Sequence, residues 1–476
     1  MAMLQVEREK ASYLRDLDAA GIPDGAPAWF QSLRAQGRRQ LESQRFPTIK
    51  DEDWKYTNIT PVLRIPFRTG PSGTAPSRFE DLGALTWGGN EWARLVFVDG
   101  RYALEASDVH ALPSGVAVEA VRHGLGVANA AGQVERDRST VLAAAEAHLG
   151  KHAAASSQAF VALNIAFLED VAVVHVPAGR TVDTPIHLVF VAQGDEVASH
   201  PRVLIVLERG AAATVIESYV GMGEGRTLSN AVSEIVLGDG AILTHYKLLQ
   251  EPEDTFHIGT TQVHQERDSV FTSFAVAVGN QLARSELNVT LAAPGADCTL
   301  YGLYVGDGSQ HVDNHTAIEH AQPHGTSRQL YKGILDGRSR AVFNGKVVVQ
   351  PGAVATDAQQ TNRNLILSDA ALVDTKPQLE IRDNDVRCSH GATIGQLDED
   401  QVFYLKSRGM GEHRARSLLT YGFANEVIAR MKLDPIRVEL DRLLLNRLDP
   451  DLEDDELPDA EVVDSPGGDV AMDGGA

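Results

Sequence analysis

The stretch from residue 359 to 411 contains the side chains whose chemistry stands out, Cys388 and His390. On a β-strand, residues two positions apart point to the same face and lie roughly 7 Å from each other. A thiolate and an imidazole at this spacing fit one soft metal site that other ligands complete. They fit two half-buried side chains equally well, so the pair alone leaves both interpretations open.

The pair lies where a strand-rich body gives way to helices. Short apolar runs between residues 365 and 381 predict strands, with turn-forming residues between them. After the pair, Asp398 can cap a helix and Gly409 can end it. The elements that position Cys388 and His390 are therefore the last strand of a sheet and the first of several helices.

Four histidines at 311, 315, 320 and 324 form a second candidate cluster. The residues around them read as a strand, on which positions i and i+4 lie about 13 Å apart. One ion cannot bridge that distance, so we expect exposed or stacked histidines here and no single-metal site.

Motifs for nucleotide binding and for a serine nucleophile are missing. Gly221, Gly223 and Gly225 lack the spacing of a dinucleotide fingerprint and predict a flexible loop. Neither a G-x-x-x-x-G-K-[S/T] phosphate loop nor a G-x-S-x-G elbow occurs in the sequence. If the protein uses nucleotide energy, we expect a partner to supply it.

Composition limits the compartment and the partners. The net charge of −22 argues against nucleic-acid binding, and the two cysteines, Cys298 and Cys388, indicate a reducing compartment. The N-terminus does not resemble a secretory signal, and no apolar run reaches the roughly 20 residues of a membrane span. We therefore expect a cytoplasmic location. Residues 449–476 contain 11 acids and no Lys or Arg, which predicts a disordered acidic tail.

The hydrophobic pattern predicts helices, then strands, then helices. Residues 1–64 form an N-terminal helical region in which Trp54 is expected to be a packing anchor, and 65–156 are a linker followed by a mixed α/β segment. Residues 157–396 are strand after strand, which favours a solenoid over a sandwich. Residues 397–448 read as three amphipathic helices, either a cap for the solenoid or a docking surface.

The motifs around Cys388 belong to a larger set: NRNL (362–365), VDTKPQLEI (373–381), CSHGATIG (388–395) and FYLKSRG (403–409), with DEDWKYTN (51–58), SRQLYKGILDG (327–337) and FNGK (343–346) upstream. This set resembles the SufB/SufD family, the scaffold subunits of the SUF iron–sulfur cluster assembly system. The Cys388 block is more similar to the SufD branch, because the SufB branch is more acidic there and has additional cysteines.

The resemblance implies a mainly β fold, a right-handed parallel β-helix core flanked by N-terminal and C-terminal α-helical domains. It implies a non-catalytic scaffold subunit that pairs with a SufB-like paralogue through the end of the β-helix. A SufC-like ATPase would dock on the C-terminal helices, 397–448. His390 matches a SufD histidine near the site of nascent cluster formation at the SufB interface, and Cys388 lies beside it.

The expected cofactors are a transient iron–sulfur cluster at the interface of the complex and, in some complexes, a reduced flavin that nothing in the sequence locates. No nucleotide is expected on this chain. A homodimer of the isolated chain remains open. Two alternatives are a β-helix carbohydrate-active enzyme, which the acidic charge opposes, and a SufB-like sulfur acceptor, which two cysteines make unfavourable.

Overall fold

The computed structural model describes residues 26–69, 82, 87–88, 91–108, 112, 116–120 and 134–448. The first 25 residues of the predicted N-terminal helical region, much of the predicted linker and the predicted acidic tail lie outside these residues. Contacts divide the chain into two compact units, residues 1–396 and 397–476. Each unit is described by itself.

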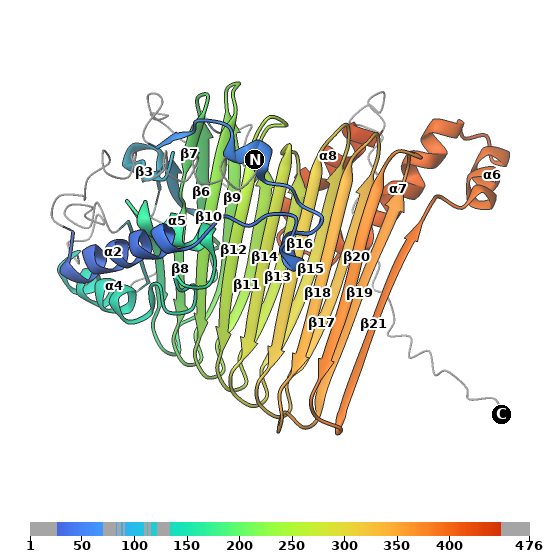
Figure 1. The fold of residues 1–476 in the computed structure, drawn as a ribbon. Coiled ribbons are helices and arrows are strands. Elements are labelled where there is room, and N and C mark those ends of the chain that lie inside the picture. Colours follow the sequence, from blue (N-terminus) through green and yellow to red (C-terminus); the bar gives the residue numbers. More distant parts are fainter. Residues whose placement is uncertain are drawn as a thin grey trace. The chain divides into compact units, whose positions relative to one another are not determined.

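The first unit is built on two sheets of mainly parallel strands, which run side by side in Figure 1. Sheet A has eleven strands: β1 (Arg68–Thr69), β4 (Ala117–Ala120), β5 (Ala172–Val176), β7 (Val197–Ser199), β8 (Arg202–Leu207), β10 (Thr227–Leu237), β12 (Phe256–Gln265), β14 (Leu282–Leu291), β16 (His311–His320), β18 (Arg340–Val349) and β20 (Leu372–Ile381). Sheet B has ten: β2 (Ala93–Val98), β3 (Arg101–Tyr102), β6 (Ile186–Gln193), β9 (Ala212–Met222), β11 (Ile242–Gln250), β13 (Val270–Val278), β15 (Asp297–Gly306), β17 (Thr326–Leu335), β19 (Thr356–Ile366) and β21 (Val386–Gly395).

From β8 to β21, successive strands alternate between the two sheets, and each strand pairs in parallel with the strand two positions later. This arrangement is a parallel β-helix, so the predicted fold class is confirmed. Sheet B also takes in β2, from the segment that the sequence assigned to a mixed α/β region. The turns between coils contain residues in the left-handed region, such as Gly240 with φ of 64° and Asp268 with φ of 53°.

The interior of the β-helix is filled by every second side chain of each strand, because successive residues of a strand point to opposite faces. One cluster of buried apolar side chains runs from Leu95 in β2 to Phe343 in β18. Within the two sheets, parallel pairing gives each inward side chain a neighbour in the same position on the next coil. A regular column of side chains therefore follows each inward position along the solenoid.

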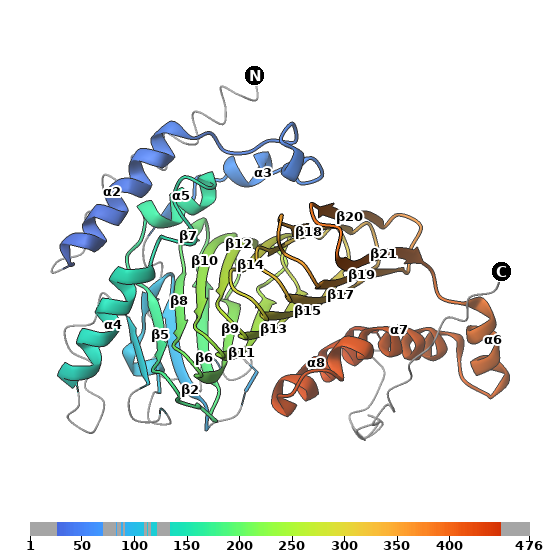
Figure 2. The same cartoon turned by 90° about the horizontal axis from the view of Figure 1, so that it is seen from below.

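Short helices cover part of sheet A, on the side where α2 and α5 lie in Figure 2. They are α2 (Ala28–Ser43), η1 (Glu52–Trp54), α3 (Thr60–Leu63), α4 (Val134–His148) and α5 (Ala159–Ala166). A further short helix, η3 (Leu104–Ala106), contacts β2 of sheet B. Helix α5 contacts α2 on one side and β10 on the other. Trp54 is buried and stacks on Phe160 of α5 at 5.7 Å between ring centroids, which confirms its predicted role as a packing anchor.

The described part of the second unit, residues 397–448, contains three helices, α6 (Glu399–Ser407), α7 (Glu412–Ile428) and α8 (Asp434–Leu448). The Asp398 side chain accepts a hydrogen bond of 2.9 Å from the Asp400 amide, as an N-cap residue should. Gly409, with φ of 92°, ends the first helix as predicted. Among the described helices of the chain, none combines the length and apolar character needed to cross a membrane.

Candidate functional site

The last coil of the β-helix is an open end. Strand β20 is the terminal strand of sheet A and β21 is the terminal strand of sheet B. In earlier coils, alternate side chains of each strand are buried, whereas in β20 and β21 almost all residues are partly or fully exposed. Among the described residues of the first unit, no further strand pairs with them to cover the inward side chains.

Strand β21 places Cys388 and His390 on the inward face of this open end. Their partners in register are Ala358 and Gln360 of β19, both buried inside the β-helix. Cys388 also packs against the buried cluster that contains Val347 and Ala358. The structure therefore brings the two predicted site residues together on one face, as their spacing in the sequence predicted.

The two residues differ in their surroundings. Cys388 is half-buried, and burial raises the pKa of its thiol above the usual value, with Asp357 adding to the effect and a bond from the Ala358 backbone opposing it. His390 is exposed. The thiol is thus held in its protonated form near neutral pH, and the imidazole is the more accessible ligand of the two.

Cys298 does not join this site. It occupies the same column of the interior as Cys388, with Ser327 and Ala358 between them. Three strand spacings correspond to about 14 Å, and Cys298 is completely buried, which raises the pKa of its thiol well above the usual value. Cys298 is therefore a core residue.

Apolar side chains surround the pair. Ile381 at the end of β20 and Ile394 in β21 are both inward-facing by register, and 43% and 48% of their surfaces are exposed. Within the described residues, no group of three or more His, Cys, Asp or Glu side chains is placed to hold one metal ion.

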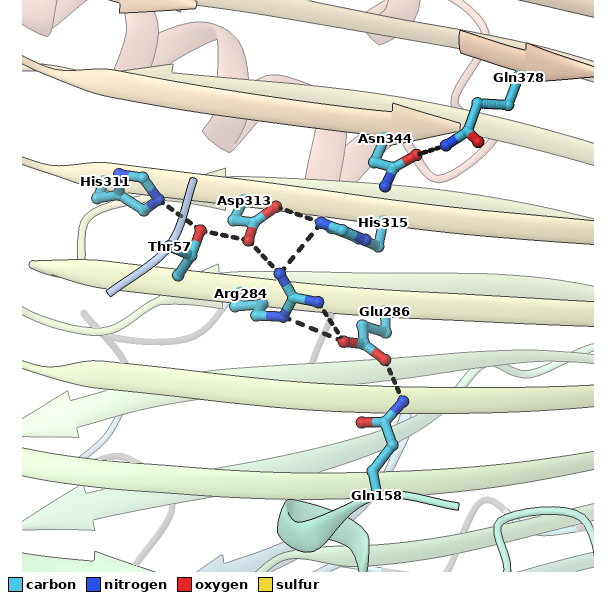
Figure 3. Close-up of polar contacts among 9 residues, drawn as sticks. All are labelled: Thr57, Gln158, Arg284, Glu286, His311, Asp313, His315, Asn344 and Gln378. Carbon is cyan, nitrogen blue, oxygen red and sulfur yellow. Dashed lines mark hydrogen bonds and ion pairs between the residues drawn. The ribbon is translucent and has the colours of Figure 1, made fainter. Parts of the chain in front are cut away.

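A second polar region lies on the outer face of sheet A and was not predicted from the sequence (Figure 3). We call it the Arg284 centre: Arg284 and Glu286 of β14, Asp313 and His315 of β16, and Thr57 and Trp54 from the N-terminal strap, residues 44–58. Arg284 is fully buried and forms ion pairs with both Asp313 and Glu286. Its guanidinium lies 3.8 Å from the centre of the Trp54 ring.

Each charge in the Arg284 centre has a partner. Nε2 of His315 lies 3.0 Å from an Asp313 oxygen, and the Thr57 hydroxyl donates to the other oxygen of Asp313. Burial opposes ionisation of Asp313, but the charges of Arg284 and His315 outweigh it, so its pKa lies well below the usual range. The centre joins the strap to two strands of the sheet, and Arg284, Asp313 and Glu286 are paired with one another.

A cavity of about 730 Å³ adjoins the Arg284 centre. It is lined by the strap, by residues 156–160, and by strands β14, β16, β18 and β20 of sheet A. Four of the charged side chains at its walls form two ion pairs, Arg45 with Asp51 and Lys376 with Glu52.

The four histidines of β16 and the following turn have separate roles. Nε2 of His311 lies 2.9 Å from the Thr57 hydroxyl, and His315 belongs to the Arg284 centre. His320 is fully buried, with Nε2 2.9 Å from the Ser327 hydroxyl, whereas His324 is exposed. The expectation of exposed or stacked rings is therefore wrong for His320, because even-numbered residues of β16 face the interior. It is also wrong for His311 and His315, which are partly buried and bonded on the outer face of the sheet.

The comparisons with known proteins identify the family. Residues 190–423 match the family model described as "SUF system FeS cluster assembly, SufBD core domain", and residues 12–188 match "SufBD protein N-terminal region". The chain belongs to the SufBD family. It is 35% identical over 410 residues to a SufBD-family iron–sulfur cluster assembly protein of Synechocystis, covering 84% of this chain and 87% of that protein.

Two further relatives are similar to this chain along most of their length. The iron–sulfur cluster assembly protein SufD of Escherichia coli is 31% identical over 438 residues, with 88% of this chain and 97% of SufD covered. A chloroplast protein of Arabidopsis thaliana is 32% identical over 436 residues, with 90% and 87% covered. The chain is thus a SufBD-family protein of iron–sulfur cluster assembly, as its motifs predicted.

Proposed function

We propose that this chain is a non-catalytic scaffold subunit that assembles iron–sulfur clusters in the cytoplasm, in a complex with a SufB-like paralogue and a SufC-like ATPase. The observation that carries the proposal is the open end of the β-helix, where Cys388 and His390 lie among exposed apolar side chains. Similarity to SufD of Escherichia coli along nearly the whole chain supports the same role.

The SufB-like partner covers the open end. Exposed strands β20 and β21 offer unpaired backbone edges and an apolar rim, and both features favour docking of another protein. His390 and Cys388 then contribute to a site that the partner completes. The nascent cluster is cargo at this interface, held by the imidazole of His390 and by thiolates of the partner.

The ATPase docks on the second unit. Helix α6 exposes 72% of Phe403 and 55% of Tyr404, a large aromatic surface for a helix of nine residues. Nucleotide binding by the partner draws two ATPase subunits together, the docked helices move with them, and the site at the open end becomes accessible to iron and sulfur.

The test of the site is complementation in cells that lack the homologous scaffold subunit. His390→Ala should reduce the activity of iron–sulfur enzymes to near the level of the empty vector. Ser389→Ala, on the same strand but facing outward, should complement like wild type. Full activity of His390→Ala at equal protein levels would refute the assignment of His390.

The test of ATPase docking is co-purification from cells that express all three subunits. The double variant Phe403→Ser/Tyr404→Ser should lose the ATPase and keep the SufB-like partner. Ile242→Ser, which changes an apolar side chain of the first unit that is 50% exposed, is the matched control. Undiminished recovery of the ATPase with the double variant would place the docking surface elsewhere.

A further inference from the structure

One inward column of the β-helix is polar and ends at His390. On adjacent strands of sheet B, Gln329 of β17 pairs in register with Gln360 of β19, and Gln360 pairs with His390 of β21. The residue that precedes Gln329 in this column is Leu300 of β15, which is buried and apolar. Three polar side chains therefore follow each other along the interior to the open end.

Each glutamine of this column donates its side-chain hydrogen bond to a residue on an earlier strand of the chain. The Gln329 amide donates to the Thr316 hydroxyl at 2.7 Å, and the Gln360 amide donates to the Gln329 carbonyl oxygen at 2.8 Å. The carbonyl oxygen of Gln360 comes next in the series, and it has no partner although the residue is only 2% exposed. Burying an acceptor without a donor is unfavourable, so this oxygen is a position where a bond is missing.

The orientation of the Gln360 amide is fixed by its neighbours. Its nitrogen points toward Gln329 in the preceding coil, so its oxygen, on the other side of the same carbon, points toward the following coil. A glycine on the opposite sheet makes room for it, because a Cβ at Gly345 would lie 2.3 Å from the Gln360 nitrogen. Pro377 follows Gly345 in register on β20 and brings no donor to that side.

Only one strong donor among the described inward side chains of the last coil remains for this oxygen. These side chains are Val373, Thr375, Pro377, Leu379 and Ile381 on β20, and Val386, Cys388, His390, Ala392 and Ile394 on β21. The Thr375 hydroxyl already donates to the Asn362 carbonyl oxygen at 2.9 Å, and a thiol is a weak donor. The remaining group is a ring N–H of His390, on the neighbouring strand.

We propose that Gln360 is a positioning residue for His390: its carbonyl oxygen accepts a hydrogen bond from one ring N–H and so directs the other ring nitrogen out of the open end. The proposal rests on the proposed function in that it explains how His390 is presented to the cluster. A neutral imidazole that donates through one nitrogen keeps a lone pair on the other, which is the nitrogen that binds a metal. The column of glutamines thus determines which nitrogen faces the partner.

The experiment uses nitrogen-15-labelled histidine in the full chain at a fixed, mildly alkaline pH, with the His390 signals assigned from a His390→Gln sample. Wild type should show a His390 ring N–H proton that exchanges slowly with water, together with one predominant tautomer. Gln360→Met keeps the length of the side chain but removes the acceptor, so the slow ring N–H should disappear and the tautomers should mix.

Three further variants separate this contact from a general effect on folding. Gln360→Glu retains an acceptor and should retain the slow ring N–H. Gly345→Ala displaces the Gln360 amide and should give the same spectrum as Gln360→Met. Gln359→Met, the outward and exposed neighbour on the same strand, should leave the signals unchanged. Slow exchange that persists in Gln360→Met, or that is missing in wild type, overturns the proposal.

The outcome is independent of the complementation test. If His390→Ala supports full cluster assembly while the slow ring N–H is present in wild type and lost in Gln360→Met, the proposed function fails and the positioning contact stands. If His390→Ala is inactive and Gln360→Met has a wild-type spectrum, the site stands and the positioning role of Gln360 is wrong.

Discussion

The open end and the Arg284 centre are both polar regions of the same β-helix, but they differ in how their polar groups are paired and covered. In the Arg284 centre the strap covers the outer face of the sheet, and each charged group has a partner. At the open end, the next coil that would cover the inward side chains is missing, so His390 is exposed and the Gln360 oxygen lacks a donor. The difference distinguishes a polar cluster that stabilises the fold from one whose polar groups are available to bind another molecule.

This contrast has a physical basis. Removing one partner of a buried ion pair leaves a charge that cannot be hydrated, so such a pair is costly to break. An exposed histidine costs the fold little when it is removed, so its presence needs another explanation. Substitutions in the two regions should therefore have opposite effects on stability and on assembly.

The largest effect on stability is expected for Arg284→Met. The substitution leaves the carboxylates of Asp313 and Glu286 buried without their cation, which should lower the free energy of unfolding by about 3 to 5 kcal/mol. Urea unfolding followed by circular dichroism measures this loss. Arg382→Met, on an exposed arginine at the end of β20, should leave the urea midpoint unchanged. A small loss for Arg284→Met would mean that water reaches the centre.

A fall in pH should destabilise the first unit through its buried histidines before it protonates the carboxylates. Burial lowers the pKa of both His187 and His200 to about 3, so the folded chain does not protonate them where the unfolded chain does, below about pH 6.5. Their contribution to stability is complete above about pH 6.5 and decreases as the pH falls toward 3. By about pH 5 the loss should reach about 2 kcal/mol for each histidine.

The pH effect is checked by urea unfolding between pH 7 and 5. His187→Gln and His200→Gln should each remove about 2 kcal/mol of the pH-dependent loss. Ser218→Ala removes the hydroxyl that lies 2.8 Å from Nε2 of His187 but keeps the histidine, so it should retain the pH dependence. Identical slopes for wild type and both histidine variants would contradict the role of these side chains.

At the open end, Ile394→Glu should affect assembly and hardly affect folding. Nearly half of the isoleucine is exposed, so the change in the free energy of unfolding should stay below about 1 kcal/mol. A carboxylate in the apolar rim must lose its hydration when a partner docks, and capture of the SufB-like subunit should decrease about tenfold or more. The control in the same pull-down is Ile242→Glu. Ile242 is about as exposed as Ile394 but is the first residue of β11. Normal capture by Ile394→Glu would place the docking surface elsewhere.

The sequence predicted the open end better than the Arg284 centre, and the reason is distance along the chain. Cys388 and His390 are two positions apart, so the period of a strand alone places them on one face. Thr57, Arg284 and Asp313 come from three distant segments, and only the stacking of coils brings them together. The contact between Gln360 and Gly345 could not be predicted from the sequence either, because it depends on which residues of opposite sheets meet across the interior.

The smallest effect should come from the exposed ion pair at the mouth of the cavity. Lys376 of β20 contacts Glu52 of the strap at 2.5 Å, but both side chains are largely hydrated, so the pair gains little over its contacts with water. Lys376→Ala should leave the urea midpoint unchanged, whereas Thr57→Val, which removes a buried hydroxyl from Asp313, should cost about 1 to 3 kcal/mol. The strap is then held by its buried contacts, Trp54 and Thr57, and not by its exposed charges. A loss for Lys376→Ala as large as that for Thr57→Val would show that the exposed pair, too, belongs to the structural region.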